Sequence, residues 1–239
     1  MTIILLTAVL ILAVNLFGTA ALAGLLTNAI GAPVNVGRLE VGLLSTHLGI
    51  KNLKIQNPQG FREETLAEIH EMSVDYDLAA LLRGKVHLKK IVLNFDTVTI
   101  EKNGGSQVNL LELGAVKGLT QGIGSGGGGK VKPQKTPGTK TGVKKTMPLQ
   151  IDEVLANIGK TRYVDSAAQP SMVKDYDLGI HDESFKNITN ASDLVKNMAY
   201  LVLRKVGLAS LTGNLDLLMK GVGGGLESTF HDLKGKFLK

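Results

Sequence analysis

Residues 122–132, GIGSGGGGKVK, have spacings typical of a phosphate-binding loop. In such loops the backbone N–H groups of closely spaced glycines cradle phosphate, and a lysine contacts the terminal phosphates. Two patterns overlap here, G-x-G-x-x-G at Gly122, Gly124 and Gly127 and G-x-x-x-x-G-K at Gly124, Gly129 and Lys130. However, Val131 stands where a magnesium-binding Ser or Thr is needed, and prolines 133, 137 and 148 prevent a helix from opening at the loop. We therefore predict no nucleotide site and no nucleotide partner.

The histidines and acidic residues form no catalytic motif. The histidines stand at positions 47, 70, 87, 181 and 231, and none lies two or four residues from another, as metal-binding pairs do. The densest polar cluster consists of Asp175, Asp177, His181, Asp182 and Glu183. Strand alternation would send Asp175 and Asp177 to one face, where a weak cation site is conceivable, but we favour a solvated strand edge as the explanation for them. Because the sequence also lacks cysteine and a nucleophile elbow, we predict no enzyme activity, no catalytic residues, no metal and no cofactor.

The positive charge is concentrated in one segment. The net charge is +6, and seven lysines lie between Gly114 and Leu149 with no acidic residue among them, which leaves 20 basic against 21 acidic residues elsewhere. Without interleaved aromatic residues, such a segment does not suit nucleic-acid binding. Its glycines and prolines predict a flexible loop over residues 114–148. Its lysines either keep the loop solvated or attract anionic lipid headgroups or an acidic partner.

The N-terminal segment predicts a membrane anchor. Residues 1–37 contain no charged side chain, and residues 3–27 are long and apolar enough to cross a bilayer as a helix. We therefore assign residues 1–30 to a transmembrane anchor. The alternative is a cleaved signal peptide, because Ala21-Leu22-Ala23 resembles a cleavage site. The side chains expected to contact lipid are Ile3, Leu5, Val9, Leu12, Leu16, Phe17, Leu22 and Leu25.

Residues 31–113 alternate apolar and polar side chains with period two, which predicts strands. The alternation starts in residues 34–41 and continues in residues 48–55, 74–78 and 91–100. Its phase slips by one residue between Ile50 and Leu53 and again between Phe95 and Val98. A slip turns the buried face over, so a bulge is expected near Lys51-Asn52. The stretch REETLAEIHEM suits either a helix or a strand.

The turns between these strands follow a pattern that is similar to that of a known protein family. One strand ends in N-P-x-G-F, at Asn57, Pro58, Gly60 and Phe61. A D-L-x-x-L-L-x-G-K segment from Asp77 to Lys85 predicts a short helix, capped by Asp77 and ended by Gly84. An N-G-G-x-x-N-L segment, Asn103 to Leu110, predicts a turn and a strand. Together with the apolar helix upstream, this pattern over residues 1–112 resembles the N-terminal module of AsmA-like proteins.

The resemblance implies a place and a role. AsmA-like proteins are anchored in the bacterial inner membrane by a single helix, with the body in the periplasm. Larger relatives form long β-sheet grooves with an apolar inner face, and they are linked to lipid movement and outer-membrane upkeep. For this chain the resemblance implies the same location and cell-envelope maintenance as its role.

Residues 149–239 complete the same domain in this interpretation. Apolar spacing from Leu149 to Ile158 predicts a strand or short helix, and residues 162–189 predict two strands with a turn at Gln169-Pro170. A helix capped by Asn190 or Ser192 should then pack on the sheet. A second amphipathic helix is expected toward the C-terminus, with an apolar stripe that could face lipid or a partner. That stripe consists of Leu226, Phe230, Leu233 and Phe237.

The resulting prediction is an α+β protein. A transmembrane helix precedes a curved antiparallel sheet, which the Gly/Lys-rich loop interrupts and C-terminal amphipathic helices cover. One hypothesis is a protein that binds or handles membrane lipid on an apolar sheet face. The alternative is a non-catalytic structural subunit, with other envelope proteins or a second copy as its partners. An uncovered apolar concavity would favour the first hypothesis, and a face covered by another protein or by the chain's own C-terminal helix would favour the second.

Overall fold

The chain forms runs of strands that are separated by helices. The computed structural model describes residues 18–42, 45–120 and 148–207, and the elements below refer to that part of the chain. A helix over residues 18–30 comes first. The strands are β1 (Val34–Gly42), β2 (His47–Gln56), β3 (Thr65–Tyr76), β4 (Val86–Lys102), β5 (Leu149–Asp165), β6 (Met172–Tyr176) and β7 (Ile180–Ile188). The further helices are α2 (Leu78–Leu82), α3 (Asn109–Glu112), α4 (Gly114–Thr120) and α5 (Ala191–Lys205).

The seven strands form a single mixed sheet. Its order is β1-β2-β3-β4-β5-β6, and β7 pairs with β5 beside β6. Neighbouring strands are antiparallel except β4 and β5, which are parallel from Val86↔Leu149 to Lys102↔Asp165. The expected α+β class and mostly antiparallel sheet are confirmed. The parallel pair at the centre was not predicted. The segment from Leu149 to Ile158, expected as a strand or short helix, is the first part of β5, and residues 162–189 contain the end of β5 and the strands β6 and β7.

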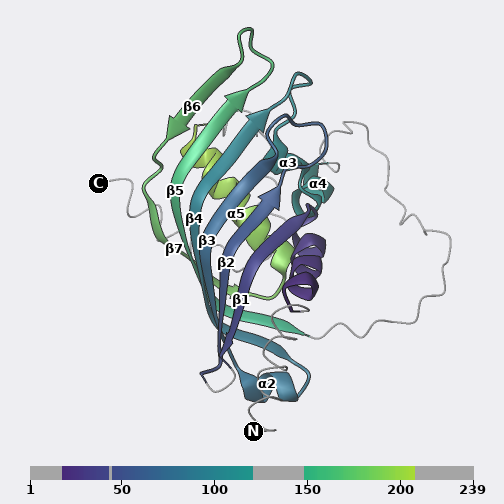
Figure 1. Ribbon diagram of the computed structural model, residues 1–239, viewed down its shortest axis with the longest axis vertical. Coiled ribbons are helices and arrows are strands. Elements are labelled where there is room, and N and C mark those ends of the chain that lie inside the picture. The colour runs from purple at the N-terminus through teal and green to yellow at the C-terminus, as the bar shows by residue number, and fades with distance from the viewer. Residues whose placement is uncertain (1–17, 43–44, 121–147, 208–239) are drawn as a thin grey trace, which may run out of the picture.

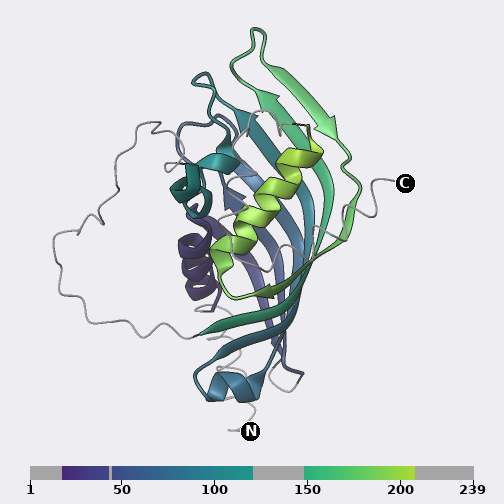
Figure 2. The same ribbon diagram turned by 180° about the vertical axis from the view of Figure 1, so that it is seen from behind.

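The sheet is curved, and its helices share one side. Figures 1 and 2 show the helix 18–30, α3, α4 and α5 on the concave side, with α5 running obliquely across it. The core consists of apolar strand residues on that side and the helix residues that face them. The prediction that the helix after residue 190 packs on the sheet is therefore confirmed, and Asn190 caps it by accepting a hydrogen bond of 2.9 Å from Ser192 N.

The phase slips predicted from the sequence are real. In β2 both Ile50 and Leu53 are buried, so the inward face changes between them. The expected bulge near Lys51-Asn52 is absent, because the pairing of β2 with β1 and with β3 keeps its register from Lys51 to Leu53. Instead Asn52 adopts a left-handed backbone, with φ of 54°. Asparagine tolerates this conformation better than most residues, and one such residue turns the following side chains to the other face.

The short turns agree with the sequence in part. Asp77 caps α2, and Gly84, with φ of 75°, follows its end as predicted. Residues 65–76 form β3, which resolves the choice between helix and strand for that stretch. The strand expected at residues 108–110 is wrong: Val108 makes only an isolated bridge to Lys102, and α3 begins at Asn109. The buried Asn109 side chain bonds to the β4 backbone at Glu101 N and Thr99 O in place of a strand ladder.

The N-terminal helix corrects part of the anchor prediction. Within the described residues no helix combines the length and the hydropathy needed to cross a membrane. In the helix 18–30, Leu22, Leu26 and Ile30 pack against the sheet core, whereas Leu25 is 69% exposed. This packing is possible because an apolar helix can bury its surface against a sheet as readily as in lipid. The other predicted anchor residues, Ile3, Leu5, Val9, Leu12, Leu16 and Phe17, lie outside the described residues.

Two further predictions fall largely outside the described part. The segment 114–148 was expected to be a loop throughout, but its first seven residues form α4. Gly114 N donates to Gly31 O at 3.3 Å, and a side chain at either glycine would overlap the other backbone. This close contact holds α4 against the end of the helix 18–30. Residues 121–147 and the stripe Leu226, Phe230, Leu233 and Phe237 lie outside the described residues.

Candidate functional site: an apolar cavity between sheet and helices

A cavity of about 160 Å³ lies between the concave face of the sheet and the helices. Every residue that lines it is Ala, Val, Leu, Ile, Met or Phe. Strands, the helix 18–30, the α3 region and α5 all contribute to its wall. The cavity therefore offers dispersion contacts and no hydrogen bond, a surface suited to a hydrocarbon group.

One row of side chains crosses the strands beneath the cavity. Leu53 pairs with Ile69, Ile69 with Phe95, and Phe95 with Ile158. Paired residues on adjacent strands point to the same face, so the four side chains form a continuous apolar strip. Leu53, Ile69 and Ile158 are at most 4% exposed. We call this row, from Leu53 to Ile158, the floor of the cavity.

The phase slips keep this floor continuous with the rest of the core. In β2, Asn52 lies between the inward Ile50 and Leu53, and in β4 two residues separate the inward Phe95 and Val98. Strict alternation would have turned one half of each strand toward solvent. The register of the pairing between β3 and β4 shifts on both sides of Ile69. The inward-facing residues on either side of the slips in β2 and β4 therefore lie on one continuous surface. The cavity lies over this part of the sheet.

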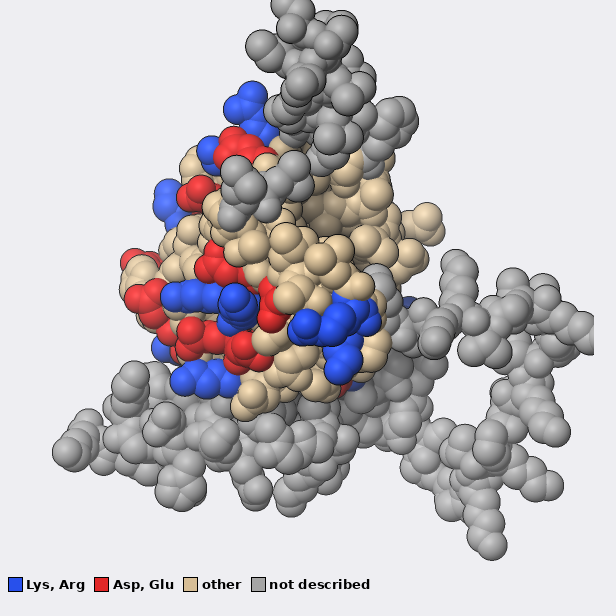
Figure 3. Space-filling model, turned by 90° about the horizontal axis from the view of Figure 1, so that it is seen from below, with Lys and Arg blue, Asp and Glu red and all other residues tan. Residues whose placement is uncertain are grey.

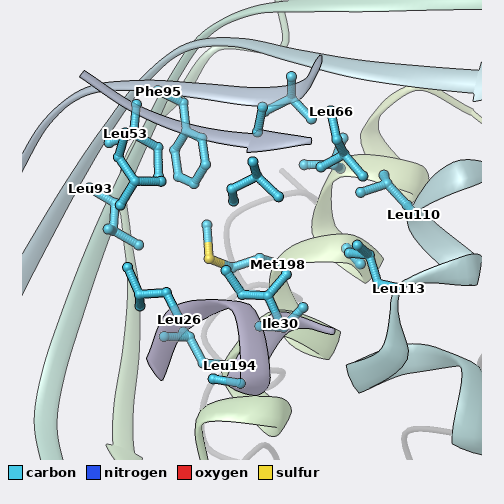
Figure 4. Close-up of a pocket in the computed structure, with 18 of the residues that line it drawn as sticks. Leu26, Ile30, Leu53, Leu66, Leu93, Phe95, Leu110, Leu113, Leu194 and Met198 are labelled. Atoms are coloured by element: carbon cyan, nitrogen blue, oxygen red, sulfur yellow. The ribbon is translucent and has the colours of Figure 1, made fainter. Parts of the chain in front are cut away.

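Two helices form the roof. The helix 18–30 contributes Leu26, Ala29 and Ile30, and α5 contributes Ala191, Leu194, Val195, Met198, Ala199 and Val202. Figure 4 shows Leu26, Ile30, Leu194 and Met198 extending from the helices toward Leu53, Leu93 and Phe95 of the strands. Leu110 and Leu113 close the side next to α3. Most of the roof residues are half-buried, whereas the floor is mostly buried.

A buried polar cluster lies at the end of β4 and stabilises the fold. Glu101 is fully buried, and its carboxylate accepts hydrogen bonds from the backbone N–H groups of Arg62 and Glu63 and from the Ser166 hydroxyl, at 2.9 to 3.0 Å. Three donors compensate for the loss of hydration of this charge. The carboxylate therefore fixes the turn after β2 to the ends of β4 and β5. Glu101 does not line the cavity described above.

The polar residues considered from the sequence do not converge. In the described part of the chain no group of three or more His, Asp or Glu side chains could hold a metal ion. Asp175 pairs with Arg162 at 3.1 Å, and the Asp177 side chain accepts from Gly179 N. His47 contacts Asp75, and His87 lies between Asp77 and Asp152 at 3.5 and 2.9 Å. The glycine pattern from Gly122 to Lys130 lies outside the described residues.

The contribution of the helix 18–30 to the cavity was missed from the sequence. Leu26, Ala29 and Ile30 stand in a segment that is apolar on all sides, and such a segment indicates membrane more strongly than it indicates a sheet partner. The available signal was the spacing of Leu22, Leu26 and Ile30, which places the three on one side of a helix that ends just before Gly31. Comparisons of this chain with protein-family models, with curated proteins and with solved structures returned no match.

Proposed function

We propose that this protein is a non-catalytic, membrane-tethered protein that binds part of a lipid acyl chain in the cavity between sheet and helices. The observation that supports this most directly is the composition of the wall, in which every lining residue is apolar. An acyl chain needs no polar partner and gains from each contact with such a wall.

The volume suits part of a chain. At about 160 Å³ the cavity is close to the size of the apolar protein cavity of about 150 Å³ that binds benzene or xenon. Pockets that hold a whole drug-sized ligand have volumes of roughly 300–1,000 Å³. The proposal therefore concerns the end of an acyl chain, with the remainder leaving between the helix 18–30 and α5, where the lining side chains are mostly half-buried.

The proposed location rests on the sequence. Residues 1–17 carry no charge and directly precede the helix 18–30. The resemblance of residues 1–112 to AsmA-like proteins supports a tether in the bacterial inner membrane, with the body in the periplasm and a role in maintaining the cell envelope. The bound chain would then come from a membrane lipid.

Filling the cavity tests the proposal. The full chain, purified in detergent, is titrated with a fluorescent polyene fatty acid whose emission rises in an apolar site. Ala29→Leu adds three carbon atoms at the cavity wall and should weaken binding roughly tenfold, equivalent to about 1.4 kcal/mol. Ala21→Leu is the matched control, because Ala21 is exposed on the same helix and is not a lining residue.

Both variants must first retain the wild-type circular dichroism spectrum and thermal midpoint. The proposal is overturned if wild type shows no saturable binding, or if Ala29→Leu and Ala21→Leu bind equally well. Native mass spectrometry of the extracted wild-type protein provides a second readout, in which lipid adducts are expected.

A structural role is the second candidate, and the position of α5 favours it. The sheet's apolar face is covered by the chain's own α5 and helix 18–30, as a scaffold would require. In that case the cavity is a packing gap, and the extracted protein should carry stoichiometric protein partners and no lipid. The same mass spectrum therefore separates the two functions.

A further inference from the structure

The short helix α2 exposes more apolar surface than its size explains. Among the described residues six large apolar side chains are exposed, and three of them are on this five-residue helix: Leu78 at 40%, Leu81 at 44% and Leu82 at 81%. Only Ala80 of α2 is buried. Figure 1 shows α2 at one end of the molecule, beyond the ends of the strands. We call Leu78, Leu81 and Leu82 the leucine tip.

The surrounding structure holds the leucine tip outward. The Asp77 side chain accepts from Ala80 N at 2.9 Å, and Lys85 N donates to Ala80 O at 3.0 Å, which fixes both ends of α2. Asp77 N also bonds to His87 O at 2.9 Å, and the His87 ring reaches Asp152 on β5. These bonds tie α2 to β4 and β5, so the leucines cannot turn inward without breaking them.

Cationic side chains adjoin the leucine tip. Arg83 and Lys85 directly follow α2, both are exposed, and neither has an ion-pair partner in the part of the chain that the structure describes. Three acidic groups lie near this end of the sheet, and each contacts a histidine: Asp75 contacts His47, and Asp77 and Asp152 contact His87. Figure 3 views the molecule from this end, where Lys and Arg atoms gather beside uncharged surface, whereas elsewhere in the view blue and red atoms intermingle.

Exposed leucines beside unpaired cations match the chemistry of an anionic bilayer surface, where apolar groups enter the acyl boundary and cations contact phosphate. A second copy of this chain fits less well. A symmetric contact through the leucine tip would bring Arg83 and Lys85 of one molecule near the same residues of the other. The positive charges of Arg83 and Lys85 therefore favour an anionic lipid surface over a second copy of this chain as the partner.

The course of the chain places this end on the membrane side. Gly42 at the end of β1 pairs with His47, which pairs with Asp75 next to α2, so Val34 lies at the end of β1 away from α2. Gly31, with φ of 77°, reverses the chain just before β1. The helix 18–30 therefore runs back along β1, and its N-terminal end faces the same way as α2 (Figure 1). In the sequence, the uncharged residues 1–17 directly precede that end of the helix.

We propose that the leucine tip is a second membrane contact, in which Leu78, Leu81 and Leu82 enter the interface of an anionic bilayer while Arg83 and Lys85 contact its phosphates. This inference rests on the proposed tether and adds an orientation: the sheet stands on the membrane with the α2 end down. The opposite end, which carries β6, is then held in water.

The absence of cysteine allows a direct test. Leu82→Cys in the full chain carries an environment-sensitive fluorophore, and the protein is reconstituted into phosphatidylcholine vesicles with or without phosphatidylglycerol. Val173→Cys is the matched control, because Val173 is also an exposed apolar residue, at 55%, but lies on β6 at the other end of the sheet. Brominated lipid should quench the probe at position 82 on anionic vesicles and leave the probe at position 173 unchanged.

A charge reversal completes the test. Arg83→Glu with Lys85→Glu should reduce lipid quenching at position 82 by roughly tenfold on anionic vesicles and hardly change it on neutral ones. Vesicle flotation is measured in parallel. If the protein floats with the vesicles but the probe at position 82 stays in water, the proposed membrane contact of the leucine tip is overturned and the tether is not. The same holds if the probes at positions 82 and 173 are quenched equally. Chains that do not float overturn the tether and the tip together, and fatty-acid binding in detergent is judged separately.

Discussion

The Asn109 side chain donates a hydrogen bond of 2.8 Å to the Asn57 side chain, across 52 residues of sequence. Asn57 starts the N-P-x-G-F turn, and Asn109 stands in the N-G-G-x-x-N-L segment. Asn57 Nδ2 in turn donates to Glu63 O at 2.7 Å, and Glu101 N donates to Asn109 Oδ1 at 3.0 Å. The two turn motifs thus form one polar cluster, buried at Asn109 and half-buried at Asn57, at the end of the sheet away from α2.

Replacing Asn109 should destabilise the protein strongly. Its side chain makes four hydrogen bonds in a fully buried site, and Asn109→Ala leaves several of the partners without a replacement. We expect the free energy of unfolding to fall by about 3 kcal/mol, measured by urea denaturation. Asn35→Ala, at an exposed position of β1, should change it by less than about 0.5 kcal/mol. Equal effects at the two sites would contradict the assignment.

Asn52 should tolerate glycine and reject a β-branched residue. Its φ of 54° is accessible to glycine without strain, whereas valine in this region costs about 1–2 kcal/mol. Because Asn52 is exposed, neither change should affect side-chain packing directly. Thermal unfolding of Asn52→Gly should match wild type within a few degrees, and Asn52→Val should unfold earlier. A valine variant as stable as wild type would mean that the phase slip does not depend on this residue.

Thr161→Val should stabilise the fold. The Thr161 hydroxyl is completely buried and has no hydrogen-bond partner among the described residues. Valine has nearly the same shape and removes the unmet polar group, so the free energy of unfolding should rise by about 1 kcal/mol. The control is Thr97→Val, at a half-exposed position of β4, which should be close to neutral. If Thr161→Val is less stable than wild type, the Thr161 hydroxyl makes a stabilising hydrogen bond and the prediction is wrong.

The fold should lose part of its stability in acid through Asp152. The hydrogen bond from His87 lowers the pKa of the Asp152 carboxyl below its usual value of 3.8, and a second bond from Gln150 adds to this effect. A carboxyl whose pKa is lower in the folded state stabilises the fold above the unfolded pKa, and that contribution disappears as pH falls through the folded pKa. Below about pH 4, wild type should therefore lose stability more steeply than Asp152→Asn.

A double mutant identifies the cause of this acid sensitivity. If His87 is the main reason for the lowered pKa, Asp152→Asn should have little further effect on the pH profile once His87→Ala is present. Denaturation curves at several pH values for the two single variants and the double variant give the comparison. Additive changes in the profile would show that Asp152 titrates independently of His87.

Local sequence patterns predicted the parts of the fold that depend on neighbours along the chain. The Asp77 cap, Gly84 after α2, the slip between Ile50 and Leu53 and the cap of α5 each follow from a few consecutive residues. The parallel pairing of β4 with β5 does not, because alternation is the same in parallel and antiparallel strands. Nor could the α3 turn be predicted, since it depends on the bonds of Asn109 to Glu101 and Asn57.

The apolar nature of the candidate site was predicted from the sequence, but the elements that form it were predicted only in part. An apolar sheet face was expected, and the floor from Leu53 to Ile158 agrees with that expectation. The roof was only half predicted: α5 was identified by its cap and apolar face, whereas Leu26 and Ile30 were assigned to a membrane helix. A uniformly apolar segment carries no pattern that distinguishes lipid from a protein surface as its environment.

The pairing of β4 with β5 has a consequence for synthesis on the ribosome. The last residue of β5 follows the last residue of β4 by 63 positions, so the long edge of β4 emerges well before its partner. At typical elongation rates of 5–20 residues per second, that edge waits roughly 3–13 s unpaired. Nascent chains with exposed strand edges tend to aggregate, so a chaperone that shields extended segments would be needed most in this interval.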